Sequence, residues 1–370
     1  MSRFRHALVL GKFYPPHAGH HHVIRTAAAG AERTTVAVLG SSVESIPIAD
    51  RVRWLAAEHA RDPGVAVLGD LDDHPMDYHD DAIWELHVGV ARAVLARRAI
   101  HDGDPAAAPV DAVYSSEEYG PELAKRLDAT HVPVDPARTV FPVSGTAVRA
   151  RPFAHWSVLA APTRAGLAAR VVVVGAESTG TTTLANDLAA HYRRRGGAFA
   201  STTVVPEYGR THTGHKLAAA RAFDPSASLE SLVWTVGDFV DVAARQAADE
   251  DAAAGASPIL VCDNDSWAAT VWCERYLGSS HPDVETDRRP HLYLLTDHVG
   301  VPYEQDGWRD GEHVRGPMTA LFVRGLCERG VPWALVAGNR AHRLRQAVRL
   351  CDEVLRRRFT FTNPLQPPLP

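Results

Sequence analysis

Two histidines in a loop that contains glycine and proline are the first residues of this chain suited to chemistry. The apolar residues 7–10 lead into this loop, and Gly19 then opens an amphipathic segment that continues to Ala29. The pattern predicts a strand, a loop and the first turns of a helix. A helix start offers unpaired N–H groups and a partial positive charge, which suit a phosphate group. His17 and His20 would add side-chain donors at the same place.

The spacing within this loop resembles the Gly-x-Phe-x-Pro-x-His-x-Gly-His signature of the nucleotidyltransferase superfamily. The matching residues are Gly11, Phe13, Pro15, His17, Gly19 and His20. Two other interpretations remain open. One is a histidine-rich surface turn. The other is a metal site formed by His17 and His21, which share a helical face, although no carboxylate close by in sequence would orient either ring.

A second polar stretch lies about a domain's length further on, at residues 141–149. Ser144, Thr146 and Arg149 surround Gly145 there, and two hydroxyls with a planar guanidinium group can wrap a polyphosphate. A Ser-Gly-Thr sequence also caps helices that bind no ligand. The stretch resembles the second signature of the same superfamily, Ile-Ser-Gly-Thr-x-Ile-Arg, with valine at both isoleucine positions.

A strongly apolar run at residues 171–174 leads into a second glycine-containing loop. The loop has the frame of a P-loop, G-x-x-x-x-G-K-[ST], but Thr181 stands at the lysine position. Backbone amides can still form an anion nest and Thr182 can still reach Mg²⁺, whereas the lysine charge on the β- and γ-phosphates is missing. The residues expected to bind phosphate are Gly175, Glu177, Ser178, Thr179, Gly180, Thr181, Thr182 and Thr183.

The missing lysine leaves three interpretations of this second loop. The charge could come from another segment, catalysis could be lost, or the loop could be a glycine turn that binds no phosphate. Four basic residues could supply the charge: Arg210, Lys216, Arg309 and Arg315.

Acidic residues follow two later strands. Residues 202–205 lead to Glu207, and the apolar residues 259–262 lead to Asp263. Asp263 fits a Walker B position, which holds Mg²⁺ directly or through water together with Thr182. A strand-terminal aspartate is also often only a helix cap.

A loop rich in glycine and charge follows at residues 306–315. It is similar to the lids of nucleoside and nucleotide kinases, whose arginines stabilise charge on a phosphoryl group in transfer. Arg309 and Arg315 are the arginines in this loop. A charged surface loop is the alternative.

Strands and helices alternate along the whole chain, which predicts parallel sheets with right-handed crossovers. The expected strands are residues 7–10, 34–39, 64–68, 107–114, 130–134, 171–174, 202–205, 259–263, 291–295 and 333–337. We therefore predict an α/β protein with a Rossmann-like nucleotidyltransferase domain at residues 1–160 and a P-loop kinase-like domain at 168–358. Residues 151–169 would form the junction.

Composition limits the classes of protein that fit. The chain has 370 residues, of which 45% are hydrophobic and 22% charged, as in ordinary globular proteins. The net charge of −5 does not indicate the excess of basic residues that is typical of nucleic-acid-binding proteins. The four cysteines show no C-x-x-C spacing, and there is no signal sequence or apolar run of about 18 residues. We expect a cytoplasmic protein that contacts neither membrane nor nucleic acid; an assembly of identical chains stays open.

The order of these motifs resembles the NadR-type bifunctional family, in which a nicotinamide-nucleotide adenylyltransferase is joined to a ribosylnicotinamide kinase. The resemblance extends from about residue 7 to 355 and includes residues 51–55, 115–120, 135–138 and 175–180. It implies NAD biosynthesis and salvage, with ATP, nicotinamide mononucleotide (NMN), nicotinamide riboside and NAD as ligands and Mg²⁺ as cofactor. We expect no helix-turn-helix module ahead of the first strand, and so no repressor role.

The resemblance also implies roles for single residues. In the adenylyltransferase reaction, His17, His20, Lys12 and Arg149 would act on the phosphates, while Gly11, Phe13, Gly19, Ser144, Gly145 and Thr146 would bind ATP. Arg51, Trp54 and Trp84 would bind NMN, with one tryptophan stacked on its cationic ring. Either tryptophan could equally be a core residue. In the kinase reaction, Glu207 and Asp263 would be catalytic.

Three rival functions remain. Another member of the superfamily, such as a pantetheine-phosphate or cytidylyl transferase, shares the first signatures but does not predict the second domain. A P-loop domain that only senses nucleotide fits the missing lysine. A DNA-binding regulator fits the acidic balance least well.

Overall fold

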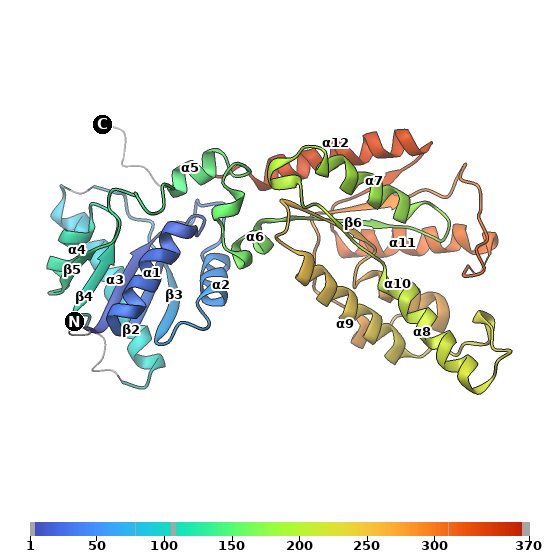
Figure 1. The fold of residues 1–370 in the computed structure, drawn as a ribbon, viewed down its shortest axis with the longest axis horizontal. Coiled ribbons are helices and arrows are strands. Elements are labelled where there is room, and N and C mark those ends of the chain that lie inside the picture. The colour runs from blue at the N-terminus through green and yellow to red at the C-terminus, as the bar shows by residue number, and fades with distance from the viewer. Residues whose placement is uncertain (1–3, 78, 105–108, 310, 365–370) are drawn as a thin grey trace. The chain divides into compact units, whose positions relative to one another are not determined.

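The computed structural model describes residues 4–77, 79–104, 109–309 and 311–364. The chain divides into two compact units, each built on a five-stranded parallel sheet (Figure 1). Unit 1 comprises residues 1–166 together with 359–370, and unit 2 comprises residues 167–358. The prediction of an α/β fold with two parallel-sheet domains is thus confirmed.

Unit 1 has the strand order β3-β2-β1-β4-β5. Its elements are β1 (Phe4–Gly11), α1 (Ala18–Gly30), β2 (Ala31–Gly40), α2 (Ile48–Glu58), β3 (Val65–Leu71), α3 (Asp81–His101), β4 (Ala112–Ser115), α4 (Gly120–Arg126), β5 (Thr130–Pro133) and α5 (Gly145–Ala150). Helices α1 and α2 share one apolar core with the sheet, and α3 and α4 share another. The central strand β1 is therefore covered on both faces, as its unbroken apolar sequence predicts.

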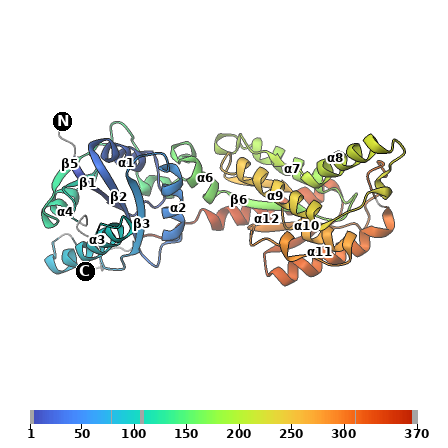
Figure 2. The same cartoon turned by 90° about the horizontal axis from the view of Figure 1, so that it is seen from below.

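Unit 2 has the strand order β10-β9-β6-β8-β7. Its strands are β6 (Ala169–Val174), β7 (Val204–Val205), β8 (Ile259–Asp263), β9 (Leu292–Thr296) and β10 (Trp333–Val336). Its helices are α7 (Thr181–Arg193), α8 (Tyr208–Phe223), α9 (Val236–Ala253), α10 (Ala268–Leu277), α11 (Arg315–Arg329) and α12 (Arg340–Arg358), with α6 (Ala161–Leu167) just before the first strand. Helices α10 and α11 close the core on one face of the sheet, while α7 packs against α12 (Figures 1 and 2).

Two segments differ from expectation. The strand expected at residues 107–114 begins only at Ala112, because the Asp111 side chain accepts the backbone N–H groups of Arg5 and His6, each at 2.9 Å. Residues 107 and 108 lie outside the described part of the chain. The expected junction is folded: α6 crosses it, and Trp156 and Leu159 are buried.

Residues 359–364, which follow unit 2 in the sequence, belong to unit 1. Phe359 is buried against Phe153 and Trp156, and residues 361 and 362 continue onto the loop after β1. Among the described residues, none of the helices is both long and apolar enough to cross a membrane.

Candidate functional site

Unit 1 contains a cavity of about 380 Å³ at the carboxyl ends of its strands. Strand β1 pairs with β2 on one side and with β4 on the other, so the cavity lies where the strand order reverses. This is where open α/β sheets bind ligands. Both nucleotidyltransferase signatures line the cavity, through Gly11, Lys12, Phe13, His17, Gly19, His20, Ser144, Gly145, Thr146 and Arg149.

His17 and His20 form a stacked pair at the start of α1. Their ring centroids are 3.7 Å apart, and the His17 backbone N–H donates to His20 Nδ1 at 3.2 Å. His20 Nδ1 is thus an acceptor, and Nε2 carries the hydrogen of the neutral ring. His17 Nδ1 is buried and has no partner among the described residues. The pair is therefore ready to bind a ligand at the helix start.

Both rings are neutral at pH 7. Burial, followed by the positive charges of Arg138 and Arg149, lowers the pKa of His17 to about 4. Burial and His17 lower the pKa of His20 well below its usual value. The histidines can therefore donate hydrogen bonds to an anion, but the fixed positive charge of the cavity belongs to Lys12 and the two arginines.

The second signature is held against the first by Arg149. Its Nη1 donates to Tyr14 O at 2.6 Å, and its guanidinium carbon lies 5.0 Å from the centroid of the Tyr14 ring. Its Nη2 donates to Thr146 Oγ1 at 3.2 Å. Ser144 caps α5, since its Oγ accepts the Ala147 N–H at 3.1 Å. Segments about 130 residues apart in sequence thus form one polar wall.

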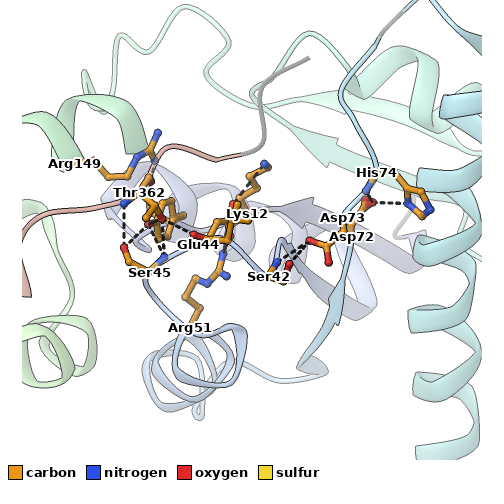
Figure 3. A network of polar contacts seen from close by, with 12 residues as sticks. Lys12, Ser42, Glu44, Ser45, Arg51, Asp72, Asp73, His74, Arg149 and Thr362 are labelled. Atoms are coloured by element: carbon orange, nitrogen blue, oxygen red, sulfur yellow. Dashed lines mark hydrogen bonds and ion pairs between the residues drawn. The ribbon is translucent and has the colours of Figure 1, made fainter. Parts of the chain in front are cut away.

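Arg51 does not reach the cavity, which corrects the expectation that it binds NMN. Its side chain is fully buried, and Nη1 forms an ion pair with Glu44 Oε2 at 2.7 Å and donates to Lys12 O at 2.7 Å. Lys12 Nζ lies 3.5 Å from the other oxygen of Glu44 (Figure 3). Arg51 therefore fixes the backbone of the loop, and Glu44 holds Lys12 in place.

The two candidate tryptophans are separated by the fold. Trp84 lines the cavity, whereas Trp54 does not and is buried against Gly166, where any Cβ would overlap the indole ring. Trp54 is therefore a core residue, and the expectation that it stacks on a ligand is corrected.

Several residues of unit 1 were missed by sequence reasoning. Arg138 lines the cavity from a loop that the Asp135 carboxylate shapes by accepting the N–H groups of residues 139, 140 and 141. Asp72, His74 and His87 line it as well. The Asp-Pro-Ala-Arg sequence at residues 135–138 was a signal for Arg138. The sequence offers no comparable signal that brings the other three together.

Unit 2 contains a cavity of about 820 Å³, lined by the whole loop from Gly175 to Thr183. Gly180 has φ of +87°, a backbone conformation that favours glycine, and it opens α7. Thr182 Oγ1 donates to Asp263 Oδ2 at 2.5 Å, while Asp263 Oδ1 is buried and has no partner among the described residues. Burial raises the pKa of Asp263. The P-loop and the strand-terminal acid thus meet as expected.

The basic residues proposed to replace the lysine divide into two groups. Arg309 and Arg210 line the cavity, and Arg309 Nη1 donates to Ser178 Oγ at 3.4 Å. Arg315 is buried and donates to Val301 O and His298 O, and Lys216 pairs with Asp238 at 2.7 Å. Neither of these two lines the cavity, although Arg315 Nη2 also donates to Ser178 O in the P-loop at 3.3 Å, so a part for either residue in phosphate binding stays a prediction.

Arg343 was missed. It comes from α12, lines the cavity, and donates to Thr179 O in the P-loop at 2.6 Å. Its other nitrogens donate to Gly338 O and Asp297 O at 2.8 and 2.7 Å. Arg343 therefore places a guanidinium charge directly behind the phosphate loop. No sequence pattern indicates this contact, because 164 positions separate Arg343 from Thr179.

Glu207 follows β7 and faces the same cavity. Its Oε1 accepts a hydrogen bond from Asn264 Nδ2 at 2.8 Å. Burial, followed by the negative charge of Asp263, raises its pKa to about 7. A carboxyl group with such a pKa can accept a proton at neutral pH.

An aromatic wall, also missed, lies next to Glu207. It consists of Trp234, Phe239, Trp272 and Tyr276, which all line the cavity. Trp234 and Tyr276 stack with their ring centroids 5.1 Å apart. Such a wall suits a flat, partly apolar ligand.

The chain resembles known proteins in both sequence and fold. A family model described as an AAA domain matches residues 170–343. The "Trifunctional NAD biosynthesis/regulator protein NadR" of Escherichia coli (strain K12) is 24% identical over 348 residues, covering 89% of this chain and 78% of the relative. The protein of the same name from Salmonella typhimurium (strain LT2) matches to the same extent.

Two solved structures share the fold. One is a NadR protein in complex with NAD and AMP-PNP, with a TM-score of 0.61, and the other is a NadR protein in complex with NR, with a TM-score of 0.60. Each is 20% identical and covers 96% of this chain and 97% of its own. The chain is thus similar in sequence to the NadR proteins over 89% of its length and shares the fold of two of them, and its second unit matches a family model described as an AAA domain.

Proposed function

We propose that the chain carries out two steps of NAD salvage. Unit 2 phosphorylates nicotinamide riboside with ATP, and unit 1 transfers AMP from a second ATP to the resulting NMN, which gives NAD and pyrophosphate. The observation that carries this proposal is the bond from Arg149 to Tyr14 O, which joins both nucleotidyltransferase signatures in one cavity. Homology to NAD biosynthesis proteins supports the choice of substrates.

In unit 1, a phosphate oxygen of NMN attacks the α-phosphorus of ATP. A new P–O bond forms, the bond to the β-phosphate breaks, and pyrophosphate leaves. The nucleophile is already an anion, so no general base is needed and the site works by positioning and electrostatic stabilisation. His20 donates from Nε2 to the phosphates, and Lys12 and Arg149 stabilise the charge that builds up on the leaving group.

In unit 2, the 5′-hydroxyl oxygen of the riboside attacks the γ-phosphorus of ATP, and ADP leaves. The hydroxyl loses a proton, which Glu207 accepts. Its pKa of about 7 suits this role, and Asn264 Nδ2 orients the carboxylate at 2.8 Å. The aromatic wall binds the nicotinamide ring, and Arg309 and Arg343 replace the charge of the missing lysine.

The metal site of unit 2 suits Mg²⁺. Asp263 Oδ1 is buried without a partner among the described residues, and the Thr182 hydroxyl lies beside the same carboxylate. These two oxygen donors would hold the ion, which when bound neutralises charge on the β- and γ-phosphates.

A second candidate for unit 2 is a nucleotide sensor without turnover. Thr181 at the lysine position favours it. The sensor binds ATP with the same loop but leaves nicotinamide riboside unchanged.

One experiment separates these functions. The purified chain is incubated with Mg-ATP and nicotinamide riboside, with NMN replacing the riboside in a parallel reaction, and products are separated by chromatography. We expect NAD from both. NAD from NMN alone identifies unit 2 as a sensor, and no NAD from either refutes the adenylyltransferase. Glu207→Gln should block only the first reaction, and His20→Ala should block NAD formation in both.

A further inference from the structure

Two imidazoles and a carboxylate meet in the wall of the unit 1 cavity. Asp72 follows β3, His74 lies two residues later, and His87 is on α3. One potential ligand atom from each residue lies within 4.8 Å of the other two. Asp72 Oδ1 is 2.9 Å from His74 Nδ1, and Asp72 Oδ2 is 2.6 Å from His87 Nδ1 (Figure 3 shows the Asp72–His74 contact). These residues have no role in the proposed transfer reaction.

The contact made by His87 Nε2 determines whether Nδ1, which faces Asp72, carries a hydrogen in the neutral ring. His87 Nε2 lies 3.0 Å from Pro75 O, and only an N–H can bond to a carbonyl oxygen. In the neutral ring, Nδ1 is then a lone pair aimed at a carboxylate oxygen 2.6 Å away. Two lone pairs repel each other at this distance, so in the metal-free protein a proton lies between them, and a metal ion bound by both atoms would replace that proton.

The arrangement is the one that orients histidine ligands in metal sites. There the outer N–H donates to a backbone carbonyl or a carboxylate, and the inner nitrogen binds the ion. Tetrahedral bonds of about 2.1 Å place neighbouring ligand atoms about 3.4 Å apart, which small side-chain movements from the present spacing can reach. Asp72 is fixed at its backbone, since its N–H donates to Gly40 O at 2.8 Å.

The exposed fractions of the three side chains also suit a metal site that an ion can enter from the cavity. The Asp72 side chain is 9% exposed, that of His87 18% and that of His74 36%. The ligands are therefore shielded from bulk water but can be reached from the cavity that they line.

We propose that Asp72, His74 and His87 bind one divalent transition-metal ion. Two imidazole nitrogens favour Zn²⁺, Co²⁺ or Ni²⁺ over Mg²⁺, which prefers oxygen ligands. The remaining coordination positions take water or an anionic oxygen from a molecule in the cavity. The site is separate from the Mg²⁺ position in unit 2 and does not depend on the proposed reactions.

Cobalt is the probe for the test. The full chain, without a histidine tag and stripped with EDTA, is titrated with Co²⁺ at pH 7.5 while visible d–d absorption is recorded. We expect one equivalent per chain with a four- or five-coordinate spectrum that Zn²⁺ abolishes. His74→Gln, His87→Gln and Asp72→Asn should each weaken binding at least about tenfold. His101→Gln, on the exposed C-terminal turn of α3, is the matched control and should change nothing.

Two results would overturn the proposal. One is the absence of a saturable cobalt spectrum in the wild-type chain. The other is a spectrum that survives in all three ligand variants, which would locate the ion elsewhere among the histidines. His74→Gln keeps the test valid if the other variants misfold, since this side chain lies in a loop and is the most exposed of the three. Circular dichroism checks the fold of each variant.

Discussion

Tyr14, in the loop that follows β1, donates its hydroxyl hydrogen to the carbonyl oxygen of Thr362, 348 positions later in the chain, at 3.1 Å. Ser45 completes the contact: its N–H donates to Thr362 Oγ1 at 2.9 Å, and its Oγ lies 2.6 Å from the tyrosine oxygen. Thr362 Oγ1 donates to Val43 O at 2.7 Å. Because the backbone oxygen of Tyr14 also accepts a hydrogen bond from Arg149, residues 361 and 362 support the cavity of unit 1.

Removing this support should slow the reaction of unit 1 alone. Thr362→Ala deletes the side-chain hydrogen bonds to Val43 O, Ser45 N and the Tyr14 hydroxyl. We expect the transition state to lose about 1 kcal/mol of this support, which corresponds to a roughly fivefold fall in NAD formation from NMN. A chain ending at Arg358 should lose more. Asn363→Ala, an exposed neighbour, is the matched control. Rates of NAD formation and of riboside phosphorylation are measured for each variant; an equal loss in both reactions would contradict a local role.

His20→Ala should lower kcat much more than it raises KM for NMN. In the proposed reaction the ring donates from Nε2 to phosphates whose charge grows in the transition state, and such a donor is worth about 10²–10³ in kcat. Initial rates at varied NMN and ATP measure the change. His101→Ala, exposed on α3, should leave both constants unaltered. An unchanged kcat in His20→Ala would remove this ring from the chemistry.

The features that the sequence predicts correctly are those formed by consecutive residues. Strands appear as apolar runs because parallel strands are buried on both faces, and each nucleotide loop contains its residues within a short stretch. Helices α8 and α9 were not assigned: α8 buries only Leu217 among its residues, so it lacks the apolar stripe that marks a helix. Residues that reach a site from distant segments, such as Arg343 and Thr362, leave no local pattern.

Arg51 shows the same limit in another way. An arginine three residues before a tryptophan is compatible in sequence with a ligand site and with a buried ion pair. Only the fold distinguishes them, by burying Arg51 against Glu44.

The ion pair leads to a stability prediction. Arg51→Met should lower the free energy of unfolding of unit 1 by about 3–5 kcal/mol, because Glu44 keeps a buried charge whose remaining cation, Lys12, lies 3.5 Å away. Urea denaturation measures this loss. The double variant with Glu44→Met should recover much of it, since no unpaired charge remains. Arg53→Met, exposed on the same helix, is the control, and an equal loss there would refute the explanation.

Arg309 and Arg315 should respond differently to the same substitution. Arg309→Gln removes a charge that faces the cavity and should lower the kinase kcat at least about tenfold with little change in melting temperature. Arg315→Gln leaves the carbonyls of Val301 and His298 without their donor and should lower the melting temperature instead. Kinase assays and thermal melts are run on both variants. A reversed pattern would return Arg315 to the site.

The pKa of Glu207 leads to a pH prediction for unit 2. A base works only when deprotonated, and the pKa is about 7, so kcat/KM for nicotinamide riboside should fall tenfold per pH unit below 7 and level off above it. Glu207→Gln should lower the rate about 10²- to 10⁴-fold and abolish this fall of kcat/KM below pH 7, the acidic limb of the profile. Asn264→Ala removes a hydrogen bond that favours the charged carboxylate, so it should move the limb to higher pH.

The adenylyltransferase reaction of the same chain is the internal control for this profile. Its nucleophile needs no base, so its rate should not share the limb near pH 7 or respond to Asn264→Ala. A kinase profile that is flat from pH 5.5 to 8, or a limb that Asn264→Ala leaves in place, would exclude Glu207 as the proton acceptor. Because the Asn264 side chain donates to the Glu207 carboxylate, a shift of the pH dependence in Asn264→Ala separates a change in the pKa of Glu207 from a general loss of activity.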